Sequence, residues 1–231
     1  EERDLPTLLG RVQEMLKSSA LRIHVLLVND GSADRTLEVA HQYAERMAMT
    51  ILDHGVNKGL GAAMLTGLEY AAQTAGTDDV VVAMDADNTH DPGLMEAMMA
   101  QIRAGSDVVI ASRYQKGGEE LGLTAARKVL SRGASTLLRF FFPIQGAFDY
   151  TCGYRAYTVK IIRRAFRSYG PLFVEERGFT CMAEILIKLN HLGARISEVP
   201  LVLRYDFKTG PSKMKFARTI WRYMILVRRL K

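Results

Sequence analysis

Cysteine and long apolar runs are both scarce in this sequence, and each shortage excludes a class of protein. The chain of 231 residues has two cysteines, Cys152 and Cys181, which are far apart and lack the spacing of a metal-binding or redox pair. We therefore expect buried, reduced thiols and no disulfide framework. No apolar run reaches about 18 residues, the length that a membrane-spanning helix needs, and no basic segment followed by an apolar one opens the sequence.

The common nucleotide-binding signatures are also missing. Neither G-x-G-x-x-G nor a phosphate loop ending in Lys-Ser/Thr occurs, although Asn57-Lys58-Gly59-Leu60-Gly61 is a glycine-bearing loop that leads into a predicted helix. Its N–H groups are suited to face an anion. The alternative is an ordinary turn, so this loop alone predicts no site.

Charge is unevenly distributed along the chain. The net charge is +6, and residues 204–231 hold nine of the 31 basic residues with one acid, Asp206. This local basicity indicates an anionic partner, and phosphate, a membrane surface and nucleic acid all remain open. With 48% hydrophobic residues, the chain can bury a large core, which favours one α/β domain with a C-terminal appendage.

Apolar patterning alternates between two periods. Runs typical of buried strands are at residues 23–28, 49–52, 80–84 and 107–112, and segments of helical period surround them, at 5–16, 34–47, 62–73 and 94–103. We also expect a loop at 116–120, a helix at 123–142, strands at 149–157 and 199–205, and helices at 158–167 and up to about 192. This order predicts an α/β fold with a doubly wound, mostly parallel sheet.

Two carboxylates follow the central predicted strand. Asp85 and Asp87 come directly after the Val80–Val82 run, and ligands collect at the carboxyl ends of strands in open α/β sheets. Hard oxygen ligands suit Mg²⁺ or Mn²⁺, so we predict a metal site at Asp85 and Asp87. The alternative is that both are turn formers that cap the strand.

Further polar residues are predicted near the same edge. Asp30 and Arg113 each follow a strand, so right-handed crossovers would bring them beside the acidic pair. Arg127 and Ser131 are four residues apart on one helix face and are suited to bind one phosphate, unless that face is simply solvated. Arg204 and Lys213 flank a glycine-containing turn at 208–213, which is either a phosphate clamp or a solvated hairpin.

The final segment, 214–231, is basic and amphipathic. Phe216, Ile220, Met224 and Val227 share one helical face, and Trp221 lies at its boundary. This pattern is typical of an interfacial membrane helix, and equally of a helix that packs on the domain with its basic face in water. We therefore divide the chain into a domain of residues 1–213 and a C-terminal helix of residues 214–231.

The motifs in order resemble the family 2 glycosyltransferases of GT-A fold, and within them the dolichol-phosphate mannosyltransferase-like branch that acts on polyprenyl phosphates. The likeness covers essentially the whole chain, through VNDGSADRT, NKGLGAA, MDADNTHDP, ASRY, RKVLSRGAS, DYTCGYRAY, GFTCMAEIL and EVPLVLRYDFKTGPSK. It implies a metal-dependent, inverting transfer of one hexose, with GDP-mannose favoured as donor and UDP-glucose possible, to a polyprenyl phosphate. It implies no nucleic-acid partner and places the reaction at the cytoplasmic face of a membrane.

The resemblance also assigns roles to residues. It implies that Asp30 and the metal on Asp85 and Asp87 hold the nucleotide-sugar, with Asp87 in the catalytic set. Arg113, Arg127 and Ser131 would serve the donor diphosphate or the acceptor phosphate, and Arg113 and Arg127 join that set. Arg204 and Lys213 match late phosphate-binding positions.

Three departures from the family pattern bear on function. The family opens with a strand and a P-x-Y-N-E-like segment that helps hold the nucleoside, and we expect this chain to start at or just after its end. Thr89 stands where the family often has Gln, and the Q-x-x-R-W signature of processive synthases is absent, which favours single transfer.

Two rival functions stay open from the sequence. A glycosyltransferase acting on a hydroxyl would need a base, for which Glu175 and Glu176 are the candidates. A non-catalytic module that binds anionic lipid or nucleic acid is the alternative of another class.

Overall fold

The computed structural model describes residues 1–207 and 216–231. The helices are α1 (Leu5–Ser18), α2 (Thr36–Ala44), α3 (Leu60–Thr74), α4 (Met95–Arg103), α5 (Ala125–Phe141), α6 (Val159–Tyr169), α7 (Cys181–His191) and α8 (Phe216–Leu230). The strands are β1 (Val25–Asn29), β2 (Met49–Asp53), β3 (Val80–Ala83), β4 (Val108–Ser112), β5 (Glu119–Leu121), β6 (Arg155–Thr158), β7 (Ile196–Pro200) and β8 (Val202–Arg204). Short 3-10 helices are at Pro92–Leu94, Gly170–Phe173 and Tyr205–Phe207.

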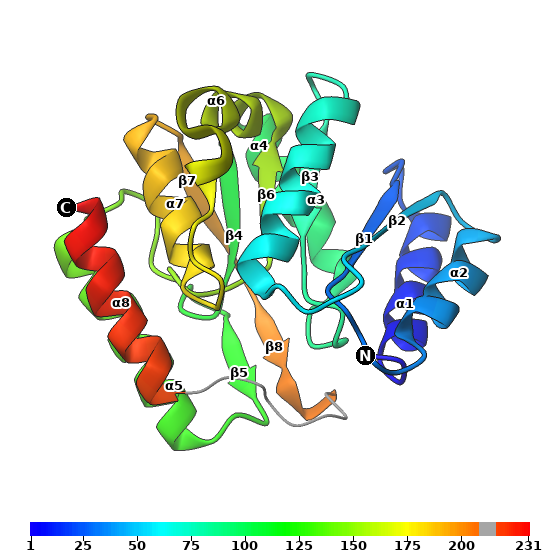
Figure 1. The fold of residues 1–231 in the computed structure, drawn as a ribbon, viewed down its shortest axis with the longest axis horizontal. Coiled ribbons are helices and arrows are strands. Elements are labelled where there is room, and N and C mark those ends of the chain that lie inside the picture. Colours follow the sequence, from blue (N-terminus) through cyan, green and yellow to red (C-terminus); the bar gives the residue numbers. More distant parts are fainter. Residues whose placement is uncertain (208–215) are drawn as a thin grey trace.

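Strands in the described ranges form three small sheets, as Figure 1 shows. The central sheet has the order β3-β6-β4-β7, while β1 pairs with β2 and β5 pairs with β8, both in parallel. The predicted α/β fold with mostly parallel pairing is confirmed, with one difference. Strand β6 lies antiparallel between β3 and β4. It enters the sheet after the long α5 excursion, so its direction is not fixed by a strand–helix–strand crossover.

Two predicted strands change their extent for local reasons. The expected strand at 149–157 begins only at Arg155, because the Asp149 carboxylate accepts the N–H groups of Thr151 and Cys152 and folds this part into a turn. The expected strand at 199–205 is divided between β7, which pairs with β4, and β8, which pairs with β5. The expected loop at 116–120 contributes its end to β5.

The main core lies between the central sheet and the helices that cover it. Strand β4 is buried along its whole length, and α7 is buried from Cys181 to Leu189. Helix α8 runs beside α5 and adds Tyr223, Leu226 and Val227 to this core. A smaller core holds α1 and α2 against the β1–β2 pair, at the right of Figure 1. No helix in the described ranges is long and apolar enough to cross a bilayer.

A large cleft separates these two parts of the molecule. It has a volume of about 2170 Å³ and takes in residues of β1 and β3 on facing sides. Their valines are only half-buried, because the cleft leaves one edge of each strand uncovered. The strand ends that carry the predicted polar residues open into this space.

Candidate active site

The cleft brings together six of the eight predicted site residues. Its lining includes Asp30, Asp85, Asp87 and Arg113, which follow strands, and Arg127 and Ser131, which belong to α5. The strand-end residues were expected to share one edge of the sheet, and Arg127 and Ser131 were expected to share one helix face.

The acidic pair lies in a turn with a specific internal structure. Asp87 is buried and accepts hydrogen bonds from the Thr89 hydroxyl at 2.6 Å and from the Thr89 N–H at 3.3 Å. Asn88, between them, adopts a left-handed backbone with φ of 61°, which Asn tolerates better than most residues. Thr89 therefore acts by orienting Asp87.

A buried histidine accepts a hydrogen bond from the backbone of the other aspartate. The Asp85 N–H donates to His90 Nδ1 at 3.2 Å, so this nitrogen is unprotonated. Burial lowers the pKa of His90, although Asp85 and Asp87 act in the opposite direction. The His90 ring stacks on Tyr154 at 5.0 Å. A neutral imidazole thus holds the start of the turn.

Arg11 of α1 binds the same turn through its guanidinium group. Arg11 Nη1 donates to the Asn88 side chain at 2.8 Å and to the His90 carbonyl at 3.3 Å, and Arg11 Nη2 pairs with Asp91 at 2.9 Å. The small α1–α2 part of the chain is joined to the acidic turn by this contact. Neither Arg11 nor His90 was predicted as a site residue from the sequence. His90 is a single histidine five residues after Asp85, and Arg11 is an isolated basic residue in a helix, so neither forms a recognisable motif.

The two aspartates suit a divalent cation. Among the described residues no group of three or more His, Cys, Asp and Glu side chains forms a complete metal cage. Mg²⁺ is usually held by one or two carboxylates together with waters and substrate phosphates, so a pair of carboxylates on a cleft matches that mode of binding.

Asp30 is held by the glycine-bearing loop. Its Oδ1 accepts the Lys58 N–H and contacts His54 Nδ1, each at 2.8 Å, and its Oδ2 accepts the Gly59 N–H at 2.8 Å. Burial raises the pKa of Asp30, but these hydrogen bonds outweigh it and the net effect lowers the pKa. The N–H groups of this loop were expected to face an anion, and that anion is the carboxylate of Asp30. The same contacts favour the ionised form of Asp30 and fix it at the cleft.

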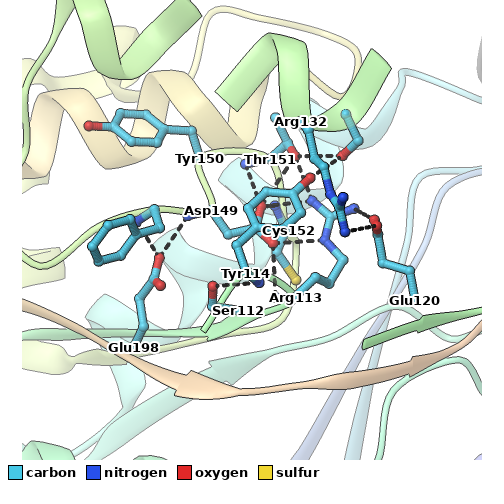
Figure 2. Close-up of polar contacts among 12 residues, drawn as sticks. Ser112, Arg113, Tyr114, Glu120, Arg132, Asp149, Tyr150, Thr151, Cys152 and Glu198 are labelled. Carbon is cyan, nitrogen blue, oxygen red and sulfur yellow. Dashed lines mark hydrogen bonds and ion pairs between the residues drawn. The ribbon is translucent and has the colours of Figure 1, made fainter. Parts of the chain in front are cut away.

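Arg113 is a buried cation with a fixed partner, as Figure 2 shows. Its Nε and Nη2 donate to the two oxygens of Asp149, both at 2.7 Å, and Nη2 also donates to Thr151 at 2.7 Å. Burial lowers the pKa of Arg113, but Asp149 raises it well above its ordinary value. The remaining nitrogen, Nη1, lies 3.5 Å from Glu120 and is the one oriented away from Asp149.

The hydroxyl groups of Tyr114, Ser131 and Thr151 form a hydrogen-bonded group beside Arg113. Tyr114 donates to Ser131 at 2.9 Å, and Ser131 lies 3.4 Å from the Thr151 hydroxyl. Burial raises the pKa of Tyr114 to about 12, so its hydroxyl stays protonated at neutral pH. Ser131 is thus brought beside Arg113 from a different element, at the edge of the cleft.

The remaining predicted cations have separate positions. Arg127 Nη1 donates to the Tyr205 hydroxyl at 2.8 Å, and both residues line the cleft. Arg204 pairs with Asp206 at 2.8 Å and stacks over Phe207 at 3.8 Å, and it is not among the residues of the cleft lining. Lys213 lies outside the described residues.

The two glutamates that were candidates for a base are both in ion pairs. Glu175 pairs with Lys188 at 2.9 Å, and this contact lowers the pKa of Glu175 below its ordinary value. Glu176 is buried and pairs with Arg222 of α8 at 3.0 Å. A carboxylate held by a cation is a weaker proton acceptor, so this geometry disfavours a hydroxyl-activating role.

Known proteins resemble this chain in sequence. A family model described as "Glycosyl transferase family 2" matches residues 1–166. The polyprenol monophosphomannose synthase of Mycolicibacterium smegmatis is 31% identical over 216 residues, which cover 93% of this chain and 77% of that protein. The dolichol-phosphate mannosyltransferase of Pyrococcus furiosus is 31% identical over 231 residues, and this chain spans only 60% of its length.

A solved structure shares the fold at low sequence identity. The glucosyl-3-phosphoglycerate synthase of Mycobacterium tuberculosis, solved with Mn²⁺, UDP-glucose and glycerol 3-phosphate, has a TM-score of 0.61 at 16% identity. The similarity covers 100% of this chain and 74% of that one. At this identity the comparison supports the GT-A arrangement of elements alone.

Proposed function

This chain belongs to the family 2 glycosyltransferases, and we propose that it moves a single hexose from a nucleotide-sugar to a polyprenyl phosphate. The observation that carries the proposal is the cleft, whose lining combines the strand-end carboxylates of Asp30, Asp85 and Asp87 with Arg113, Arg127 and Ser131. The carboxylates suit a metal-bound diphosphate, and the cationic and hydroxyl groups suit a phosphate monoester.

The donor would occupy the acidic side of the cleft. Asp30, fixed by the loop before α3, would receive hydroxyl or N–H donors of the nucleoside. Asp85 and Asp87 would hold Mg²⁺ or Mn²⁺, which supplies positive charge to stabilise the departing nucleoside diphosphate. Mannose is favoured because both relatives are named for mannosyl transfer, with GDP-mannose as our preferred donor and UDP-glucose as the nearest alternative.

The acceptor phosphate would lie against the cationic side. Arg127 and Ser131 of α5 would donate to it, with Arg113 Nη1 behind them. A phosphate monoester with a second pKa of about 6 is largely dianionic at neutral pH, so its oxygen needs positioning and no separate base. The attack would come from the face opposite the leaving group, which inverts the anomeric centre. The commitment of Glu175 and Glu176 to ion pairs supports this acceptor over a hydroxyl.

Helix α8 supports a peripheral membrane contact for the lipid acceptor. This helix exposes Trp221 by 67%, together with Met224 and Ile225, and with Ile220 where it borders the cleft. Such a stripe on a basic helix is typical of interfacial binding, and we place it at the cytoplasmic face of a membrane.

A transfer assay tests the proposal. The protein would be incubated with Mn²⁺ or Mg²⁺, a panel of radiolabelled nucleotide-sugars and a short polyprenyl phosphate, and the label that enters the organic phase would be counted. We expect metal-dependent lipid labelling from one donor. Donor binding without a lipid product would instead support a hydroxyl acceptor, and absence of donor binding would support a non-catalytic module.

A further inference from the structure

A cluster of charges around two buried glutamates joins α8 to the segment 174–180. It contains three acids and three bases in mutual ion pairs: Glu175, Glu176, Glu184, Lys188, Arg222 and Arg229. The side chains of Glu176 and Glu184 are 0% exposed. Buried carboxylates of this kind require counter-charges, and α8 supplies most of them.

The arginines of α8 contact both buried acids. Arg222 Nε donates to Glu176 Oε2 at 3.0 Å, and Arg229 Nη2 donates to Glu184 Oε1 at 2.7 Å while lying 3.3 Å from Glu176 Oε1. Thr180 also donates to Glu176, at 2.6 Å. The position of α8 is therefore fixed by two arginines two helical turns apart on its inner side.

Glu184 also fixes the backbone of residues 175 and 176. Glu184 Oε2 accepts the N–H groups of Glu175 at 2.9 Å and of Glu176 at 2.8 Å. Its two oxygens thus connect α8 on one side to the backbone at 175–176 on the other. A change in the charge of this cluster acts directly on that backbone.

The backbone of residues 176–177 packs closely against the start of α3. Gly61 N–H donates to the Arg177 carbonyl at 3.0 Å, and a Cβ at Gly61 would lie 1.7 Å from the Glu176 carbonyl oxygen. At Gly59, with φ of 97°, a Cβ would lie 2.5 Å from the Arg177 carbonyl oxygen. The N–H of Gly59 is one of the groups that hold Asp30. A continuous set of contacts therefore runs from α8 to Asp30, and both ends line the cleft.

We infer that Arg222 and Arg229 are positioning residues for the donor: they neutralise Glu176 and Glu184, and so hold segment 175–177 against the loop that fixes Asp30. This rests on the proposed function, in which Asp30 meets the nucleoside. Each of these buried carboxylates has two cationic partners, and loss of one leaves part of its charge uncompensated, which favours movement toward water and loosens the contact with Gly59 and Gly61. Helix α8 is then part of the donor site in addition to its outward apolar face.

The test is nucleotide binding to the whole chain without an acceptor. Calorimetric titration with GDP and with UDP, each in the presence of Mn²⁺, would compare wild type with Arg222→Gln. We expect the Kd of the better nucleotide to rise roughly tenfold, within the range of energetic coupling between linked sites. Arg228→Gln is the matched control, since it removes the same charge from an exposed position of the same helix, and we expect it to stay within about twofold of wild type.

A double-mutant cycle separates positioning from general loss of structure. In a Glu176→Gln background the added effect of Arg222→Gln on Kd should fall to about twofold, because the charge to be neutralised is gone. Arg222→Lys, which keeps the charge, should restore most of the affinity. Thermal unfolding would verify that each variant is folded at the titration temperature.

The outcomes distinguish this inference from the proposed function. Equal nucleotide affinities for wild type and a folded Arg222→Gln variant would overturn the positioning role and leave the proposed function standing. A wild-type chain that binds neither GDP nor UDP would overturn both. An equally large effect of Arg222→Gln with and without Glu176→Gln would refute the charge-based coupling.

Discussion

Arg113 and Asp149 form a two-point ion pair beneath the cleft, with both nitrogen–oxygen distances at 2.7 Å and the Asp149 side chain 0% exposed. Asp149 also accepts backbone N–H groups of Thr151 and Cys152, while Glu198 accepts the Asp149 N–H at 2.7 Å (Figure 2). The pair therefore shapes the turn that places Thr151 beside Ser131. Arg113 therefore has a structural role, and its Nη1 is the nitrogen that lies near another carboxylate, that of Glu120.

The first prediction concerns the stability that this pair provides. Asp149→Asn removes the partner of a buried guanidinium, so we expect the free energy of unfolding to fall by about 3–5 kcal/mol. Urea denaturation at neutral pH measures this loss. Asp78→Asn, at an exposed surface pair with Lys160, should leave it essentially unchanged and serves as the control.

The same pair predicts a pH dependence. Burial raises the pKa of Asp149, but Arg113 and the hydrogen bonds lower it below the ordinary value of 3.8. A carboxylate with a depressed folded-state pKa stabilises the fold above pH 3.8, and this stability is lost as the pH falls through the lower folded-state pKa. Wild type should thus lose stability steeply in acid, and Asp149→Asn less steeply. Parallel curves for the two proteins would contradict this assignment.

The second prediction tests the metal site. Asp87→Asn keeps the acceptor for the Thr89 hydroxyl but removes a charge, so we expect the turn to persist and metal-dependent transfer to fall by at least about a hundredfold. Titration of Mn²⁺ followed by electron paramagnetic resonance would show weaker metal binding independently of activity. Wild-type Mn²⁺ affinity and activity in this variant would remove the central role of Asp87.

The third prediction concerns the acceptor side. Arg127→Ala should raise the KM for polyprenyl phosphate by roughly tenfold, because one charge-assisted hydrogen bond to phosphate is lost, while the KM for the donor stays near its wild-type value. Lys128→Ala removes the same charge from the next residue of α5 and is the matched control. Identical acceptor kinetics for Arg127→Ala and wild type would retire Arg127 as a phosphate ligand.

The fourth prediction concerns the outward side of α8. Trp221→Glu places a charge on the exposed apolar stripe, so we expect binding to vesicles that contain anionic lipid to fall by roughly tenfold or more. Co-sedimentation with vesicles at two salt concentrations measures it. Val56→Glu introduces the same charge at another exposed apolar residue, in the loop after β2, and should leave vesicle binding unchanged.

Much of the site was predictable from the sequence for a local reason. The β-branched run Val80–Val82 is followed closely by two carboxylates, so Asp85 and Asp87 were expected at a strand end, where the structure has them. Asp30 and Arg113 followed from the same strand-end logic, Arg127 and Ser131 from their spacing on one helix face, and all four line the cleft. Their precise catalytic roles remain predictions.

The partners of those residues were not predictable in this way. Asp149 is 36 residues from Arg113, and Arg222 is 46 residues from Glu176, so no local period connects them. The antiparallel position of β6 was missed for a related reason, since pairing across the sheet depends on how the chain returns after α5.

The sequence by itself determined the order of helices and strands, the family, and which residue types stand at the strand ends, because these depend on side-chain periodicity and on motifs that are contiguous in the chain. Only the tertiary structure decided which charges are used internally. Asp30 is held by the loop before α3, Arg113 by Asp149, and Glu176 by Arg222. A buried charged group needs hydrogen-bonding or oppositely charged partners, and which partners it has depends on distances in space that the sequence does not contain.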